Sequence, residues 1–260
     1  MKELVGRADI LFITLDTLRY DAAQEAWKDG RLEVLGSYLG ESGWEKRHTP
    51  GSFTYAAHHA FFAGFLPTPI GPGPHCRLFA ARFAGSLSTG DTTFDFEEST
   101  LPEALTARGY RTICIGGTGF FSGHNELARV LPGLFAEAHW NPELGVTCPE
   151  SPANQVAQAL RSIDAAGLQR VFVFINVSAI HQPNWFYGAS EGPDTLATHT
   201  SALVAVDRAL HPLFARLRRR APTFAIVCSD HGTAYGESGY WGHRLGHDVV
   251  WNVPYAEFML

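Results

Sequence analysis

The sequence predicts a three-layer α/β/α sandwich built around a mostly parallel central sheet. Short apolar runs recur along the chain, and amphipathic runs with helical periodicity alternate with them. A short and nearly unbroken apolar run is typical of a strand that is buried on both faces. Strands that alternate with helices indicate crossover connections, which place helices on both faces of one sheet. At 260 residues and 45% hydrophobic content the chain can fill such a core, and we expect one domain over residues 1–260.

The predicted elements follow one another in a regular order. The strand predictions depend on apolar runs such as ILFITL at 10–15 and FAIVCS at 224–229. The predicted strands cover residues 9–15, 110–115, 171–177, 223–229 and 254–260. The predicted helices cover residues 22–40, 55–64, 76–87, 100–108, 152–166 and 196–218. The helix at 100–108 has the clearest limits, because Ser99 or Thr100 can cap its start and Gly109 follows its end.

Three segments are predicted to be loops. Residues 66–76 are too rich in proline and glycine for a helix or a strand. The glycine-rich residues 116–126 and the polar residues 184–194 are both candidates for a mobile lid.

The charge balance and the cysteines exclude several classes of protein. A net charge of −6 and a pI near 6.0 argue against nucleic acid as a partner, because nucleic acid favours a basic face. The run RLRRR at 216–220 fits the solvated end of a helix, where cations suit the helix dipole. We see no signal peptide and no apolar stretch of about 20 residues. We therefore expect a cytoplasmic protein with reduced cysteines and no membrane partner, while a homo-oligomer stays open.

Two aspartates and a histidine stand where predicted strands end. Asp16 follows the run at 10–15, and Asp230 follows the run at 224–229 and is followed at once by His231. Open α/β sheets build their sites at the carboxyl edge of their strands, so the two strand ends can face one point. Carboxylate oxygens and an imidazole nitrogen together form a ligand set for a divalent metal ion.

Thr54 is a further candidate, at the start of a predicted helix. It stands at the N-cap position before residues 55–62, which contain no helix breaker. One interpretation is that Thr54 simply caps a buried helix. The other is that the helix N-terminus attracts an anion and that a metal cation lowers the pKa of the Thr54 hydroxyl, which then acts as a nucleophile. The residues alone leave both interpretations open.

Four segments spread over nearly the whole chain resemble one enzyme superfamily. They are LDTLRYD at 15–21, the segment from Thr54 to GFLP at 64–67, AIHQP at 179–183, and SDHG at 229–232 followed by GESGYWGH at 236–243. In this order they resemble the alkaline phosphatase superfamily, specifically its sulfatase-like and phosphonate or phosphodiester hydrolase branch. The resemblance implies an alkaline-phosphatase-like fold and a metal-dependent reaction on a small anionic ester.

The resemblance also implies roles for individual residues. It implies metal contacts from four of them, Asp16, Asp230, His231 and the Thr54 hydroxyl. His181 matches a histidine that binds the anionic oxygens of the substrate or serves the leaving group, and His243 stands where many relatives have a lysine with similar work. With Thr54, these two histidines are the implied catalytic residues.

Three residues are implied to bind substrate. His58 stands at the position of the arginine in the sulfatase signature, and Arg19 matches a family position near the site. His247 follows the last matching segment and is a candidate for substrate contact or for a second metal ion, as is Asp248.

Two departures from the family pattern change these expectations. Sulfatases make formylglycine from a cysteine or serine, and threonine cannot be converted, so Thr54 points to the phosphodiesterase and phosphotransferase relatives. The chain also ends soon after the last strand, which predicts that the smaller C-terminal domain of many sulfatases is lacking.

The resemblance favours one divalent metal ion over two. The pair Asp207 and His211 has the spacing of a second site, yet Asp207 better matches a structural position. An Asp, Asp, His and Thr set suits Mn²⁺ or Zn²⁺, whereas Ca²⁺ or Mg²⁺ would prefer oxygen ligands alone.

The function implied is a metal-dependent hydrolase or transferase of a phosphate ester, diester or phosphonate, with Thr54 as a metal-bound nucleophile. Hydrolysis of a sulfate ester without formylglycine is an alternative. A non-catalytic member of the fold that binds an anion or a partner protein is another, and the missing arginine and lysine support it.

Overall fold

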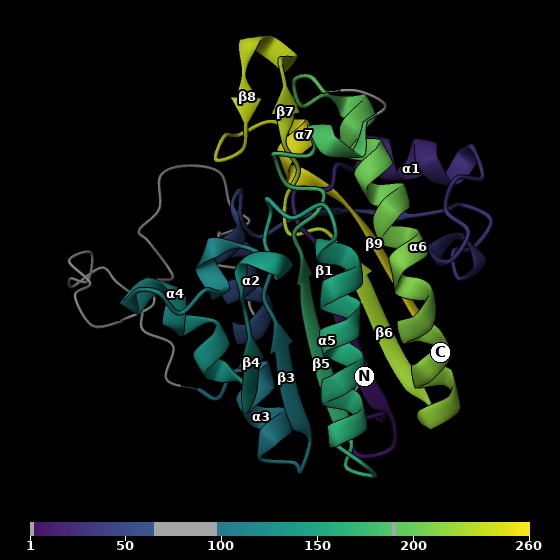
Figure 1. Ribbon diagram of the computed structural model, residues 1–260, viewed down its shortest axis with the longest axis vertical. Coiled ribbons are helices and arrows are strands. Elements are labelled where there is room, and N and C mark those ends of the chain that lie inside the picture. The colour runs from purple at the N-terminus through teal and green to yellow at the C-terminus, as the bar shows by residue number, and fades with distance from the viewer. Residues whose placement is uncertain (1–2, 65–97, 189–190) are drawn as a thin grey trace.

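A mostly parallel sheet forms the centre of the computed structural model, which describes residues 3–64, 98–188 and 191–260 (Figure 1). Seven strands of these described residues pair in the order β2 (Glu45–His48), β9 (Asn252–Met259), β6 (Thr223–Cys228), β1 (Asp9–Leu15), β5 (Val171–Val177), β3 (Arg111–Ile115) and β4 (Glu137–His139). The strands β6, β1, β5, β3 and β4 pair in parallel. At one side of the sheet, β9 pairs antiparallel with both β6 and β2. The predicted fold class is therefore confirmed, with an antiparallel edge that the sequence did not indicate.

Side chains of β1 alternate between two hydrophobic cores, one on each face of the sheet. Leu11, Ile13 and Leu15 belong to a core that also contains residues of α1 (Tyr20–Lys28), α5 (Ser151–Ala165) and α6 (Leu196–Arg220). Ile10 and Phe12 belong to a second core, which includes residues of α2 (Thr54–Ala63) and α3 (Leu101–Thr106). A strand with period-two alternation and apolar residues on both sides must be covered on both faces, which makes the three layers.

Most predicted elements are present, with ends shifted by a few residues. The helix expected over 22–40 is wrong in length: α1 ends at Lys28, Gly30 adopts a φ of +67°, and only a 3₁₀ turn at Leu35–Ser37 follows. The helix expected over 76–87 and the loop at 66–76 lie outside the described residues. The sequence also gave no sign of β2, because Glu45–His48 is exposed along its whole length and carries no apolar pattern.

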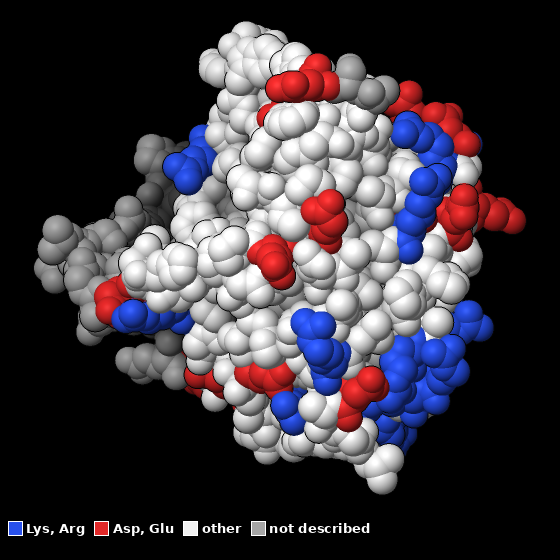
Figure 2. Space-filling model, in the orientation of Figure 1, with Lys and Arg blue, Asp and Glu red and all other residues white. Residues whose placement is uncertain are grey.

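The elements that carry the site project from one edge of the sheet. A two-stranded hairpin of β7 (Ala234–Tyr235) and β8 (Trp241–Gly242) follows β6 and stands above the sheet at the top of Figure 1. Figure 2 shows Lys and Arg side chains gathered at the lower right, where the C-terminal end of α6 lies in Figure 1. That end of α6 leads into the start of β6, so its arginines lie at the opposite edge from the hairpin.

The long helix α6 is amphipathic and not a membrane span. It has 25 residues, but arginines fill its last turn and Pro212 interrupts it. No helix in the described part of the chain has both the length and the apolar character needed to cross a bilayer.

Asp207 fastens α6 to the segment that follows α1. Its fully buried carboxylate accepts hydrogen bonds from the backbone N–H groups of Val34 (3.0 Å) and Leu35 (2.7 Å). The carboxylate therefore holds the start of the 3₁₀ turn at Leu35–Ser37 against α6. This contact gives Asp207 the structural role that the sequence suggested.

We expect Asp207→Ala to lower the free energy of unfolding by about 2–3 kcal/mol, because it leaves two buried backbone N–H groups without an acceptor. Asp207→Asn keeps one acceptor oxygen and should lose clearly less. Urea denaturation of both variants measures this. Equal losses in the two variants would contradict the assigned hydrogen bonds.

Candidate metal centre and active site

Asp16, Asp230 and His231 come together at the carboxyl edge of the sheet. β1 and β6 are parallel neighbours, so the residues that follow them emerge side by side. All three side chains are fully buried, and one donor atom from each lies within 4.8 Å of the others. The structure thus brings together the three residues that the sequence predicted to share an ion.

The backbone around the carboxylates is shaped to hold them. Thr17 adopts a φ of +65°, which is strained for a β-branched residue, and its N–H donates to Asp230 Oδ1 at 3.1 Å. The N–H of His231 donates to the same oxygen at 2.9 Å. Both bonds fix one oxygen of Asp230 and leave the other to face Asp16.

A backbone carbonyl sets the orientation of the His231 ring. His231 Nδ1–H donates to the carbonyl oxygen of Gly232 at 2.9 Å, which leaves Nε2 with its lone pair toward the aspartates. Gly232 itself has to be glycine, since a Cβ there would lie 1.8 Å from the carbonyl oxygen of Val249. The turn after β6 therefore presents a metal-binding nitrogen.

The donor set fits a divalent cation. Three buried atoms at this point have no hydrogen-bond partner among the described residues: Asp16 Oδ1, Asp230 Oδ2 and His231 Nε2. Burial raises the pKa of Asp16 to about 6, helped by repulsion from Asp230, and burial raises the pKa of Asp230 to about 7. Two buried carboxylates that each have one oxygen without a partner are costly, and a bound cation would reduce that cost.

Asn176 supports this centre and was missed by the sequence analysis. Its amide nitrogen donates to Asp16 Oδ2 at 2.9 Å, and its oxygen accepts from the N–H of Thr118 at 3.1 Å. The signal that could have found it is a polar residue inside the otherwise apolar strand Val171–Val177, where a buried amide needs partners.

Thr54 lies beside the metal centre as the first residue of α2. Its Oγ1 lies 3.4 Å from Asp16 Oδ2, and the side chain is 3% exposed. The expected N-cap role is wrong, because Phe53 has the extended backbone of the cap residue and Thr54 is already helical. The hydroxyl is therefore not used to cap the helix and faces the carboxylate.

The structure buries His58, for which the resemblance implied contact with substrate. It lies one turn after Thr54 on α2, is fully buried, and its Nδ1–H donates to the Thr54 carbonyl oxygen at 2.6 Å. Its Nε2 accepts from the Thr14 hydroxyl at 2.8 Å. Burial lowers the pKa of His58 to about 3, so the ring is neutral and supports the Thr54 segment from below.

Arg19 is likewise buried and forms ion pairs. Its guanidinium pairs with the carboxylates of Asp21 and Glu237, and the residue is 3% exposed. Glu237 belongs to the β7–β8 hairpin and also accepts from the Tyr235 N–H at 2.6 Å. Arg19 therefore links the hairpin to the start of α1, and each of its two terminal guanidinium nitrogens is paired with a carboxylate.

His247 has a local structural role. Its Nδ1 accepts from the N–H of Val249 at 3.2 Å and caps α7 (Asp248–Trp251). The residue does not line the cavity of about 670 Å³ that opens beside Thr54. Within the described ranges, Asp16, Asp230 and His231 are the one group of three potential ligands that come together, and neither Asp248 nor Asp207 belongs to it.

A cavity of about 670 Å³ opens beside Thr54 and contains both remaining histidines. His181 and His243 line it and their ring centroids are 5.6 Å apart, while the His243 ring lies 4.6 Å from that of His231. Its other described walls are largely apolar and come from four segments: Phe120 in the loop at 116–126, Leu127 on α4 (Glu126–Val130), Val146 in a turn, and Trp241 in the hairpin. The cavity thus lies beside the metal centre, next to Thr54 and His243, and offers space for an organic group.

The two histidines differ in their surroundings. His181 Nδ1–H donates to the carbonyl oxygen of Gln182, so its Nε2 is the ring atom free to accept or deliver a proton. Burial, together with the neighbouring His231 and His181, lowers the pKa of His243 to about 3, so the ring is neutral near pH 7.

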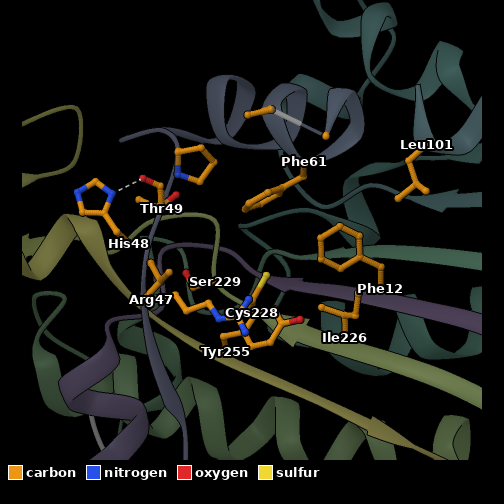
Figure 3. Close-up of a pocket in the computed structure, with 14 residues that line it drawn as sticks. Phe12, Arg47, His48, Thr49, Phe61, Leu101, Ile226, Cys228, Ser229 and Tyr255 are labelled. Atoms are coloured by element: carbon orange, nitrogen blue, oxygen red, sulfur yellow. Dashed lines mark hydrogen bonds between the residues drawn. The ribbon is translucent and has the colours of Figure 1, made fainter. Parts of the chain in front are cut away.

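A second cavity, of about 400 Å³, is separate from this chemistry (Figure 3). Phe12, Phe61, Leu101 and Ile226 form its apolar walls, and Arg47 lies over the Tyr255 ring at 3.5 Å on another side. None of the predicted metal-binding or catalytic residues lines it.

A sequence model of the sulfatase family matches residues 9–256. The chain belongs to the sulfatase family. Its fold is that of the alkaline phosphatase superfamily, to which a structural neighbour from Vibrio parahaemolyticus is assigned. No curated protein matches the sequence significantly.

Solved structures place the fold among enzymes of several kinds. The soluble domain of lipooligosaccharide phosphoethanolamine transferase A from Neisseria meningitidis is similar with a TM-score of 0.68 at 12% identity, over 97% of this chain and 76% of that chain. The periplasmic domain of EptC from Escherichia coli, in complex with zinc, has a TM-score of 0.64 at 9% identity, over 96% and 72%. A sulfatase from Pseudoalteromonas sp. has a TM-score of 0.56 at 16% identity, over 99% and 63%.

We expect Zn²⁺ or Mn²⁺ to raise the melting temperature of the purified protein after chelation, because a ligand at 100 times its Kd stabilises by about 2.7 kcal/mol. Asp230→Asn should abolish this response and leave the metal-free protein at least as stable, since it removes one of two buried like charges. The control is Asp248→Asn, which alters an exposed carboxylate nearby. An unchanged metal response in Asp230→Asn would contradict the assigned centre.

His199 makes stability depend on pH. This fully buried ring accepts from the Arg19 N–H at 3.3 Å, and burial, with the Arg19 charge, lowers its pKa to about 3. The unfolded chain takes up this proton below pH 6.5, so stability falls as the pH falls. We expect the difference in unfolding free energy between wild type and His199→Gln to shrink by about 2 kcal/mol from pH 7 to pH 5 in urea titrations. A constant difference would contradict a neutral buried ring.

Proposed function

We propose that this protein is a metal-dependent hydrolase or transferase of a phosphate ester, diester or phosphonate, with Thr54 as its nucleophile. The observation that carries the proposal is the position of the Thr54 hydroxyl, 3.4 Å from Asp16 Oδ2 at the metal centre and on the wall of the 670 Å³ cavity. Family membership and the similarity to phosphoethanolamine transferases support a reaction at an ester of this kind.

The proposed metal ligands are Asp16, Asp230, His231 and the Thr54 hydroxyl. A divalent cation bound there would supply positive charge that lowers the pKa of the hydroxyl and attracts a non-bridging oxygen of the ester. Zinc and manganese suit this mixture of oxygen and imidazole donors, and the zinc complex of the Escherichia coli neighbour is consistent with the first.

The proposed reaction has two steps. The Thr54 hydroxyl gives up its proton to solvent, its oxygen attacks phosphorus, the bond from phosphorus to the leaving oxygen breaks, and a phosphothreonine forms. His181 Nε2, once protonated, delivers a proton to the leaving oxygen, while neutral His243 donates a hydrogen bond. Water or an acceptor alcohol then attacks phosphorus and gives up its proton to the histidine, the bond from phosphorus to the Thr54 oxygen breaks, and Thr54 takes up a proton from solvent.

Sulfate-ester hydrolysis is the second candidate, favoured by the family match over residues 9–256. Thr54 cannot become formylglycine, so this activity would use the same direct attack on sulfur. A third candidate, a non-catalytic anion-binding module, draws support from the neutral His58 and His243. The intact set of unpartnered donors around Thr54 weighs against it, because a pure binding module has no need to keep a nucleophile beside a metal centre.

One screen separates these candidates. The protein loaded with Zn²⁺ or Mn²⁺ is assayed with p-nitrophenyl phosphate, its diester, a p-nitrophenyl phosphonate and p-nitrophenyl sulfate, with and without glycerol as acceptor. Turnover of a phosphorus ester supports the proposal, turnover of the sulfate alone favours the second candidate, and no turnover favours the third.

We expect Thr54→Ala to lower kcat/KM by about three orders of magnitude or more on the best substrate, as loss of a nucleophile does in other enzymes. Metal content should change little, because three ligands remain. Thr54→Ser keeps the oxygen and should retain measurable turnover. Trapped wild-type protein should carry a phosphoryl group on Thr54 by mass spectrometry. Full activity in Thr54→Ala would remove Thr54 from the reaction.

A further inference from the structure

Arg244 is the one Lys, Arg, Asp or Glu among the described residues that line the active-site cavity. The remaining lining residues are apolar, hydroxyl, amide and glycine residues together with His181 and His243. A cavity that accepts an anionic ester needs positive charge to replace the water around the anion. Beyond a bound metal ion, Arg244 is the residue in this wall that always carries such charge.

The backbone ties Arg244 to the segment that carries Thr54. The N–H of Arg244 donates to the carbonyl oxygen of Ser52 at 2.9 Å, two residues before Thr54. Its guanidinium lies 5.6 Å from the centre of the Phe53 ring, within the range of a cation–π contact. The exposed side chain is therefore held at the cavity beside the helix start that positions the proposed nucleophile.

The conformation of Arg244 is unfavourable for its residue type. Its φ is +69°, in the left-handed region that glycine adopts readily and in which an arginine is strained. Gly242, two positions earlier, also has a positive φ, of +81°, so at that position the chain uses glycine for a left-handed backbone. Strained residues concentrate at functional sites, where the function of the side chain outweighs the cost of the strained backbone.

We propose that Arg244 is a substrate-binding residue whose guanidinium holds an anionic oxygen of the phosphoryl or sulfuryl group in this cavity. A guanidinium offers paired N–H donors that match two oxygens of such a group. A monoester with two negative charges gains more from this contact than a diester with one. The inference depends on the proposed function, since it assumes an anionic ester in the cavity.

The arginine cluster at the end of α6 is a poor alternative. Arg220 pairs with Asp9 at the start of β1, and Arg216 pairs with Asp164, so much of that charge is already neutralised. The cluster also lies at the opposite edge of the sheet from Asp16 and Thr54. The exposed Arg218 from this cluster is therefore a matched control for removing one positive charge.

The first test measures binding without turnover. Inorganic phosphate and sulfate are titrated separately into the zinc-loaded wild type, Arg244→Gln, Arg244→Lys and Arg218→Gln by calorimetry. We expect Arg244→Gln to weaken phosphate binding at least tenfold, Arg244→Lys to lose less, and Arg218→Gln to match wild type. Equal binding in wild type and Arg244→Gln, an equal loss in Arg218→Gln, or no anion binding by wild type would each overturn the proposal.

The second test separates this inference from the proposed function. On p-nitrophenyl phosphate, Arg244→Gln should lower kcat/KM at least tenfold, mainly through KM, and on the diester by less than threefold. Equal losses on both esters would overturn the assignment to the phosphoryl group. If no ester is turned over but phosphate binding depends on Arg244, the proposed function fails and the anion-binding residue stands.

A glycine variant tests whether the side chain is kept for binding or for stability. Arg244→Gly relieves the strain of the positive φ, so its melting temperature should equal or exceed that of wild type while phosphate binding falls as in Arg244→Gln. A clearly lower melting temperature in both Arg244→Gly and Arg244→Gln, with unchanged phosphate binding, would show that Arg244 has a structural role alone.

Discussion

Two buried carboxylates that face each other at the edge of the sheet are the constraint on which this site depends. Asp16 and Asp230 follow neighbouring parallel strands, and neither side chain is exposed to water. Burial raises the pKa of Asp16 to about 6, with repulsion from Asp230 adding to the rise, and burial raises the pKa of Asp230 to about 7, so the pair holds a proton or a cation near neutral pH. A protein that keeps such a pair accepts a cost in stability, and that cost is reasonable only where the charge is used.

The surrounding structure keeps this pair in place and leaves one side of it open. Backbone N–H groups of Thr17 and His231 occupy one oxygen of Asp230, and Asn176 occupies one oxygen of Asp16. The oxygens left over face the same space as His231 Nε2. Each supporting contact is made by the backbone just after a strand or by a neighbouring strand, so the sheet itself fixes the geometry.

The sequence predicted the parts of the molecule that depend on position along the chain. Apolar runs ended where β1 and β6 end, and this placed Asp16 and Asp230 at the correct edge. It did not predict where side chains point: Arg19 and His58 are near the site, yet one pairs with the hairpin and the other faces the core. It also missed β2, an exposed edge strand of polar residues that pairs with β9, because such a strand leaves no mark in the apolar pattern.

Few positively charged groups line the cavity beside Thr54: Arg244 is the one Lys or Arg among its described residues. His58 and His243 occupy positions where the family resemblance suggests arginine and lysine, and burial keeps both rings neutral. In the proposed reaction, the charge that stabilises the transferring anionic group would come from a metal ion at the carboxylate pair and from Arg244 beside the start of α2. Two separate cationic groups would bind two oxygens of the anionic group and so orient it for attack by Thr54.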